Sequence, residues 1–169
     1  MTCAIVRAAG PPGTATRLRD IDGSSAGSRA LRILVVEDDP GMRLLCSVNL
    51  ELAGFSVALA STGLEGLERT RHEHFDLVLL DVMLPDLGGL DVAERLRSAP
   101  GTAQLPIVFF SARASRADIE QGRLAGAIDY IVKPFDPLTL ADRLLDDFEE
   151  HRRSGHDGVR RMRFGPSRS

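Results

Sequence analysis

The sequence predicts an α/β fold in which five parallel strands form one sheet covered by helices. Five short runs rich in Val, Ile, Leu and Phe recur between residues 31 and 132. Each run is continuously apolar, which is typical of strands covered on both faces and therefore of a parallel sheet. Segments with helical spacing or helix caps separate the runs. This alternation implies βαβ units and a doubly wound sheet.

Each expected strand stops at a polar residue, and four of the five stops could handle a phosphoryl group or a metal ion. The strands are expected over residues 32–36, 55–60, 75–80, 105–110 and 128–132. The residues that follow them are, in order, Glu37-Asp38-Asp39, Ser61-Thr62, Asp81, Ser111 and Lys133-Pro134. Parallel strands end on one edge of the sheet, where open α/β proteins bind their ligands. We therefore expect these side chains to converge.

The helices are expected from caps and from the spacing of apolar residues. The first begins after Asp39-Pro40, an N-cap acid followed by a proline at the first helical position, and Gly54 stops it. A second is expected over residues 62–73, a third over 89–98, and a weakly amphipathic fourth over 114–125. The last begins at Asp136-Pro137 and places four apolar residues on one face, Leu138, Ala141, Leu145 and Phe148.

The length and composition fit one globular domain between two tails. The 169 residues are 43% hydrophobic and 27% charged, which is ordinary for a soluble domain. Residues 1–30, rich in Gly, Pro and Ser, and the basic residues 151–169 are expected to be disordered tails. No stretch approaches the roughly 20 apolar residues of a membrane span. Because no secretory signal is evident either, we expect a cytoplasmic protein with no membrane partner.

The net charge of −3 hides an acidic central domain. Residues 33–150 carry nine Arg and one Lys against 21 acidic residues, a net charge of −11. An acidic domain is a poor candidate for binding nucleic acid by itself, so DNA is not expected as a partner. The basic C-terminal tail is expected to be solvated, with docking to a partner as the alternative.

Asp81 is the strongest candidate for chemistry. Its carboxylate could attack a phosphoryl donor and form an acyl phosphate. Because both groups are negative, the reaction needs a divalent cation, and Glu37 and Asp38 supply oxygen ligands suited to Mg²⁺. Lys133 could neutralise one phosphoryl oxygen, and Ser111 could donate a hydrogen bond to another. Taken alone, each of these residues is more often a turn, cap or loop residue, but their order at successive strand ends favours one site.

Four motifs resemble the receiver domain of bacterial two-component response regulators. They are Val35-Val36-Glu37-Asp38-Asp39-Pro40, Asp81-Val82-Met83-Leu84-Pro85-Asp86-Leu87-Gly88-Gly89, Ser111-Ala112 and Lys133-Pro134-Phe135. The resemblance covers residues 31–150, which would form the receiver domain. It implies a flavodoxin-like fold with strand order 2-1-3-4-5. That order puts the second strand at the edge, which would explain why it ends without functional groups.

The resemblance also implies how the acidic residues work. Asp81 would accept phosphate from a phosphohistidine on a sensor histidine kinase or a phosphotransfer protein. Asp38, Asp81 and the backbone carbonyl of Met83 would bind Mg²⁺, and Glu37 would contribute through a water molecule.

A second group of residues would sense the phosphoryl group. Ser111 would close on it, Lys133 would pair with it, and Tyr130 would be an aromatic switch whose rotamer follows Ser111. The peptide bond between Lys133 and Pro134 is expected to be cis.

The signal would reach an unidentified downstream protein through the face formed by the helix near 114–125, the strand at 128–132 and the last helix. The same face is a candidate homodimer interface. Asp129 and Arg143 are expected to be exposed on it, either joined across a dimer or simply solvated.

We therefore expect a single-domain response regulator, a binding module with slow self-dephosphorylation rather than an enzyme. Three alternatives stay open. One is the receiver part of a DNA-binding transcriptional regulator, although the 19 residues after Glu150 are too few for such a domain. Another is an aspartyl phosphatase of the haloacid dehalogenase type, but Met83 stands where those enzymes need a second acid. The third, a receiver that is never phosphorylated, is opposed by the intact Asp81, Asp38, Ser111 and Lys133.

Overall fold

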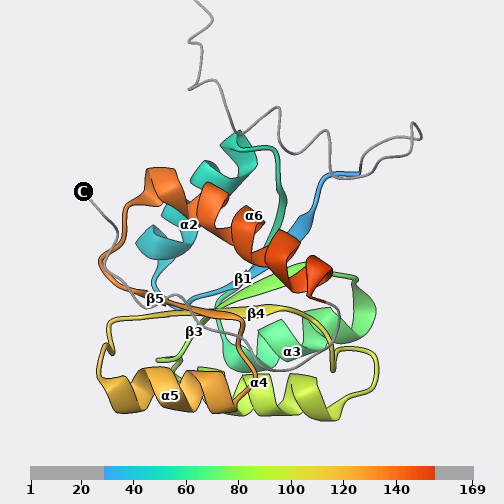
Figure 1. The fold of residues 1–169 in the computed structure, drawn as a ribbon, viewed down its shortest axis with the longest axis vertical. Helices are drawn as coiled ribbons and strands as arrows, with labels where there is room; N and C mark the ends of the chain where they lie inside the picture. Colours follow the sequence, from blue (N-terminus) through green and yellow to red (C-terminus); the bar gives the residue numbers. More distant parts are fainter. Residues whose placement is uncertain (1–28, 155–169) are drawn as a thin grey trace, which may run out of the picture.

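The computed structural model describes residues 29–154, which form a five-stranded sheet between two layers of helices (Figure 1). Most of the two expected tails, residues 1–28 and 155–169, lies outside the described residues. The strands are β1 (Arg32–Val36), β2 (Ser56–Ala60), β3 (Leu77–Asp81), β4 (Ile107–Ser111) and β5 (Asp129–Val132). The helices are α2 (Pro40–Leu52), α3 (Gly63–His72), α4 (Gly89–Ser98), α5 (Arg116–Leu124) and α6 (Pro137–Arg153).

All neighbouring strands are parallel, in the order β2-β1-β3-β4-β5. This confirms the predicted flavodoxin-like order, with β2 at one edge of the sheet and β5 at the other. Because side chains alternate between the two faces of a strand, the sheet has a core on each side. Ile33 and Val35 of β1 share a core with α2 and α6. Leu34 and Val36 share the opposite core with α3, α4 and α5.

The capping residues identified in the sequence set the helix boundaries. Asp39 accepts a hydrogen bond from the Met42 N–H at 2.6 Å, and Pro40 is the first residue of α2. Gly54 has a φ of +95°, a conformation that favours glycine and that stops this helix. Asp136 caps α6 by accepting the Leu138 N–H at 2.9 Å, and Pro137 is the first residue of that helix. These starts and stops agree with the predicted ones.

Several boundaries differ from the prediction by one to three residues, and three of these differences have a clear physical cause. β3 starts later because the carboxylate of Asp76 accepts the Arg32 N–H at 2.7 Å, at the entrance to the sheet. β4 also starts later, just after Pro106, which has no N–H to donate to a ladder. α6 continues past residue 150 to Arg153, since basic residues suit the negative end of a helix dipole.

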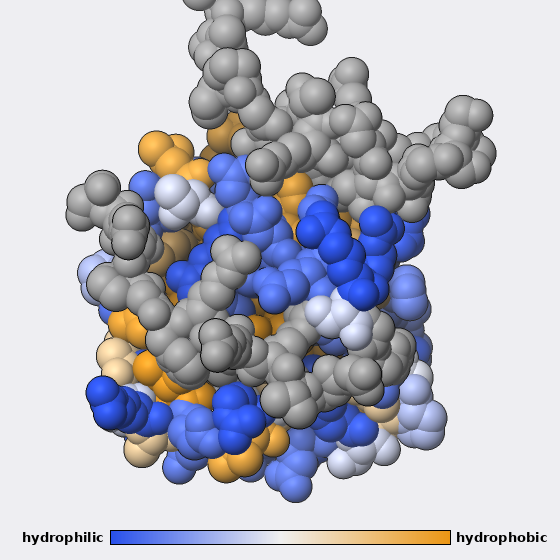
Figure 2. Space-filling model, in the orientation of Figure 1, coloured by the Kyte–Doolittle hydropathy of each residue, from blue (hydrophilic) through white to orange (hydrophobic). Residues whose placement is uncertain are grey.

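Hydrophilic residues cover the outer side of α6 in the view of Figure 2. Among the described helices, none has both the length and the apolar content needed to cross a bilayer. Exposed apolar side chains are found on α2, at Leu44, Val48 and Leu52.

Candidate functional site

Four strands end in the candidate site, at the carboxyl edge of the sheet. Asp81 is the last residue of β3, Ser111 is the last residue of β4, and Glu37 directly follows β1. Lys133 directly follows β5, and its Nζ lies 2.5 Å from Glu37 Oε2 and 2.8 Å from Asp81 Oδ2. Residues that are up to 96 positions apart therefore meet in one charged cluster, because the sheet brings their strands together.

An acidic cluster suited to a divalent cation surrounds Asp81. Glu37, Asp38 and Asp81 each offer a carboxylate oxygen, and these oxygens lie within 4.8 Å of one another. Glu37 and Asp81 are buried, with exposures of 1% and 4%, whereas Asp38 is exposed. Three carboxylates against one ammonium leave a negative charge. Hard oxygen donors in this number fit Mg²⁺, so the residues present are compatible with such an ion.

Burial and ion pairing shift the pKa values of the charged residues. Burial raises the pKa of the Glu37 carboxyl, although the hydrogen bond from Lys133 acts against it. Burial alone would lower the pKa of the Lys133 ammonium, but its hydrogen bonds to Asp81 and Glu37 outweigh this effect and the pKa is raised. The ammonium also lies 4.4 Å from the ring centre of Phe110. Lys133 is therefore charged at neutral pH.

Backbone contacts hold the two loops that carry the carboxylates. The Met83 N–H donates to Asp81 Oδ1 at 2.9 Å, so both carboxylate oxygens of Asp81 have a donor. Arg43 of α2 donates to the backbone carbonyls of Glu37 and Asp38 at 2.8 and 3.0 Å. Sequence reasoning missed Arg43. Arg43 could have been predicted, because it lies shortly after Glu37 and Asp38 in the sequence, near the start of α2.

Ser111 and Tyr130 meet at the loop after β4. Ser111 is fully buried, and its hydroxyl accepts a hydrogen bond from the Arg113 N–H at 3.2 Å. Tyr130 is 4% exposed and lies beside Phe109, with the ring centres 6.1 Å apart. Its hydroxyl donates to the Arg113 carbonyl at 2.9 Å. The two residues of the predicted switch therefore share one contact residue, and the Tyr130 ring is held inside the protein.

The packing of Tyr130 can be tested by titration, because it is the only tyrosine of the chain. Burial raises the pKa of its phenol. Ultraviolet titration of the native protein should give a midpoint above the value of about 10 for free tyrosine, and denaturant should restore that value. The fold then favours the neutral phenol, so the free energy of unfolding should fall as the pH rises above about 10. A native midpoint at or below the denatured one would contradict the buried position.

The prediction that Asp129 and Arg143 are exposed is wrong. Asp129 is 1% exposed, and its Oδ2 accepts a hydrogen bond from Arg143 Nε of the same chain at 2.6 Å. Arg143 Nη2 also donates to the Tyr130 carbonyl at 3.2 Å. The reason is the two-residue period of a strand. Asp129 lies on the same face of β5 as Ile131, whose core includes α6, so its carboxylate meets a side chain of that helix.

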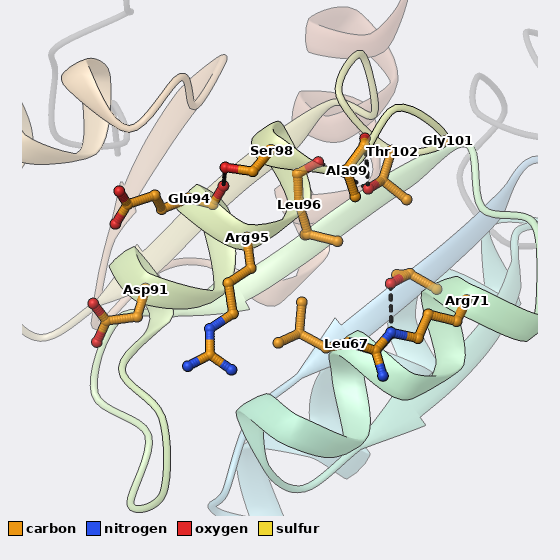
Figure 3. A pocket seen from close by; sticks show the side chains of 11 residues that line it. Leu67, Arg71, Asp91, Glu94, Arg95, Leu96, Ser98, Ala99, Gly101 and Thr102 are labelled. Atoms are coloured by element: carbon orange, nitrogen blue, oxygen red, sulfur yellow. Dashed lines mark hydrogen bonds between the residues drawn. The ribbon is translucent and has the colours of Figure 1, made fainter.

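A groove of about 760 Å³ lies between α3 and α4 (Figure 3). Arg95 extends from α4 into the space between the helices, while Asp91 and Glu94 line the same groove. None of the residues of the acidic cluster lines it. The groove therefore lacks the buried charges found at the edge of the sheet.

Comparison with protein families gives a match over most of the chain. Residues 33–145 match the response regulator receiver domain. Among solved structures, a receiver domain protein (CheY-like) from Methanospirillum hungatei is 30% identical, with a TM-score of 0.69. The similarity covers 75% of this chain and 100% of that structure. The family match and the structural likeness thus agree with the observed strand order.

The similar curated proteins are longer than this chain. The transcriptional regulatory protein CseB of Streptomyces coelicolor is 41% identical over 126 residues, which is 75% of this chain and 51% of CseB. The DNA-binding dual master transcriptional regulator RpaA of Synechocystis is 42% identical over 113 residues, which is 67% of this chain and 47% of RpaA. The chain therefore spans about half the length of the curated relatives it matches.

Proposed function

This chain belongs to the family of response regulator receiver domains, and we propose that it accepts a phosphoryl group on Asp81 and switches the binding of a partner in response. The donor would be a phosphohistidine on a sensor histidine kinase or a phosphotransfer protein. The observation that carries the proposal is the contact of Lys133 with both Glu37 and Asp81 at the end of the parallel strands. The contact supports the proposal because it holds a positive charge beside the proposed nucleophile Asp81 and the acidic residue Glu37.

The proposed reaction is a transfer between two atoms. A carboxylate oxygen of Asp81 attacks the phosphorus, the bond from phosphorus to the donor imidazole nitrogen breaks, and that imidazole leaves with its electron pair and takes up a proton. Lys133 neutralises a phosphoryl oxygen, and the Ser111 hydroxyl donates a hydrogen bond to another. Orienting and neutralising the charged groups is most of what phosphoryl transfer requires.

The acidic cluster would bind Mg²⁺ in this proposal. Asp38, Asp81 and the Met83 carbonyl would be its ligands, with Glu37 acting through water. When bound, the ion would supply the positive charge that two negatively charged reactants need.

We further propose that the phosphoryl group is lost slowly to water, without enzymatic turnover of a substrate. Met83, two residues after Asp81, has no group that can act as a general acid or base. A dedicated phosphatase would need such a group there.

We also propose that the protein acts in the cytoplasm, as expected from its sequence.

Phosphorylation by a small donor tests the proposal. The full chain is incubated with Mg²⁺ and acetyl phosphate, and its intact mass is compared with that of an Asp81→Asn variant. The wild type should gain one phosphoryl group, in an adduct that is stable in acid and labile in base, and the variant should gain none. No adduct on the wild type, or an equal adduct on the variant, would overturn the proposal.

The output is proposed to pass through the face formed by α5, β5 and α6. Gly122 is the only buried residue of α5, so this helix has little packing to lose. Tyr130 of β5 packs against Gly122 and is the only fluorophore other than phenylalanine, because the chain has no tryptophan. Adding beryllofluoride with Mg²⁺ should therefore change the Tyr130 emission and its quenching by acrylamide in the wild type but not in Asp81→Asn. Unchanged emission on the bound wild type would contradict a switch at Tyr130.

We propose that the chain acts as a stand-alone regulator, and its similarity to DNA-binding regulators supports a second candidate. The regulators CseB and RpaA are about twice as long as the region they share with it. The second candidate is therefore the receiver part of a longer transcriptional regulator. The intact mass of the native protein isolated from its own cells separates the two. A mass equal to that of the 169 residues supports a stand-alone regulator, and a larger mass supports the second candidate.

A further inference from the structure

The start of α3 is capped by a residue from a distant loop. The backbone N–H groups of Gly63 and Leu64 donate to Asp86 Oδ1 and Oδ2, each at 2.9 Å. The first N–H groups of any helix have no partner inside it. The next one here, that of Glu65, donates to the side chain of the N-cap residue Thr62 at 3.1 Å. Thr62 therefore accepts only the third N–H group of α3, and Asp86 accepts the first two.

Asp86 belongs to the loop that leads from Asp81 to α4, residues 82–88. Near its start, the Met83 N–H donates to Asp81 Oδ1 at 2.9 Å. Near its end, the loop lies so close to α3 that a Cβ atom on Gly63 would be 2.5 Å from the Leu87 carbonyl oxygen. The loop is thus held to Asp81 on one side and to α3 on the other.

We propose that Asp86 is a positioning residue of the phosphorylation site, which fixes loop 82–88 by binding it to the first turn of α3. The inference rests on the proposed function, because the loop contains Met83, whose carbonyl is a proposed ligand of Mg²⁺. With the loop fixed, that carbonyl and the Met83 N–H keep their places relative to Asp81. Without the contact, the loop loses its two hydrogen bonds to the first turn of α3.

The charge of Asp86 suits this role. Partial burial acts in the opposite direction, but the hydrogen bonds from the Leu64 and Gly63 N–H groups prevail and lower the pKa of the Asp86 carboxyl. The group is therefore ionised at neutral pH. A negative charge at the positive end of the α3 dipole is favourable in addition to the hydrogen bonds.

The test is the affinity of the full chain for Mg²⁺, measured by calorimetry without any phosphodonor. Asp86→Ala should weaken binding by roughly tenfold, the usual effect of removing a residue that orients metal ligands. Asp86→Asn keeps one acceptor oxygen and should lie between this variant and the wild type. Asp91→Ala is the matched control, since it removes the same charge from the first turn of α4 but none of these hydrogen bonds. Its affinity should equal that of the wild type.

Hydrogen exchange adds a readout that a purely structural cap would not change. Mg²⁺ should slow the exchange of the Gly63 and Leu64 amides in the wild type, because the ion and these amides hold the same loop. In Asp86→Ala the ion should leave their exchange unchanged.

Two outcomes separate this inference from the proposed function. If the wild type is phosphorylated on Asp81 but Asp86→Ala binds Mg²⁺ as tightly as Asp91→Ala does, the inference is overturned and the function stands. If the wild type forms no adduct on Asp81, the function itself is overturned. Should Asp86→Ala fail to fold, Asp86→Asn decides, since an affinity equal to that of the wild type would overturn the inference.

Discussion

Replacing Lys133 with methionine is expected to lower the free energy of unfolding by about 3 kcal/mol, measured by urea unfolding without divalent cations. Its ammonium is the charge that contacts the buried carboxylates of Glu37 and Asp81, at 2.5 and 2.8 Å. Methionine keeps most of the side-chain volume but leaves two buried like charges facing each other. Removing one member of a buried charged group usually costs more than the group contributes as a whole.

Asp81→Asn is the matched comparison for this prediction. It removes one of the two like charges and leaves the pair between Lys133 and Glu37 intact, so its stability should equal or exceed that of the wild type. Only Lys133→Met should therefore destabilise the protein, although both variants change the same cluster. Lys133→Met as stable as the wild type, or Asp81→Asn less stable than Lys133→Met, would contradict this account of the charges.

Gly122→Ala is expected to destabilise the protein by about 1–2 kcal/mol and to displace the Tyr130 ring. A Cβ atom at residue 122 would lie 2.9 Å from Tyr130 Cδ2 and 3.1 Å from Phe109 Cδ2. Alanine in a helix normally gains about 1 kcal/mol over glycine. Overpacking of a well-filled core costs about 1–3 kcal/mol, and here it should outweigh that gain because both contacts are buried rings.

Urea unfolding and acrylamide quenching of the Tyr130 fluorescence measure the two parts of this prediction. Gly101→Ala is the control, because nothing lies within 4 Å of a Cβ atom added there. The control should keep the stability and the quenching of the wild type. A Gly122→Ala variant that is more stable than the wild type, with an equally protected tyrosine, would show that α5 does not hold Tyr130.

The fold could be predicted from the sequence because its signals are local. Apolar runs covered on both faces gave the strands, and caps such as Asp39, Asp136 and Gly54 gave the helix boundaries. The strand order came from the resemblance to a family rather than from periodicity, since periodicity does not say which strands are neighbours. The boundaries that moved did so because of contacts between distant residues, such as the one between Asp76 and Arg32.

The site was predicted less completely for the same physical reason. The residues at the strand ends could be identified because a parallel sheet collects all its carboxyl ends on one edge. The supporting contacts could not, because Asp86 binds α3 from 22 and 23 residues away. Asp129 was misplaced because a charged residue suggests an exposed position, and only the structure shows the Arg143 side chain that pairs with it.

Gly122 shows how the same residue can be interpreted differently once its neighbours are known. In the sequence, the helix near 114–125 is weakly amphipathic, and a glycine inside a helix usually weakens it further. In the structure Gly122 is the buried residue of α5, and the helix lies close to the Tyr130 ring at this position. The helix is thus loosely packed along most of its length, with one close contact to the predicted switch residue.

Mapping the phosphoryl group to a single residue tests the central claim most directly. After incubation with Mg²⁺ and acetyl phosphate, borohydride reduces an aspartyl phosphate to homoserine, which tandem mass spectrometry locates in the sequence. The account predicts homoserine at position 81 in the treated wild type and at no other acidic residue. Homoserine at a different aspartate, or its absence from position 81, would contradict the claim that Asp81 is the phosphoryl acceptor.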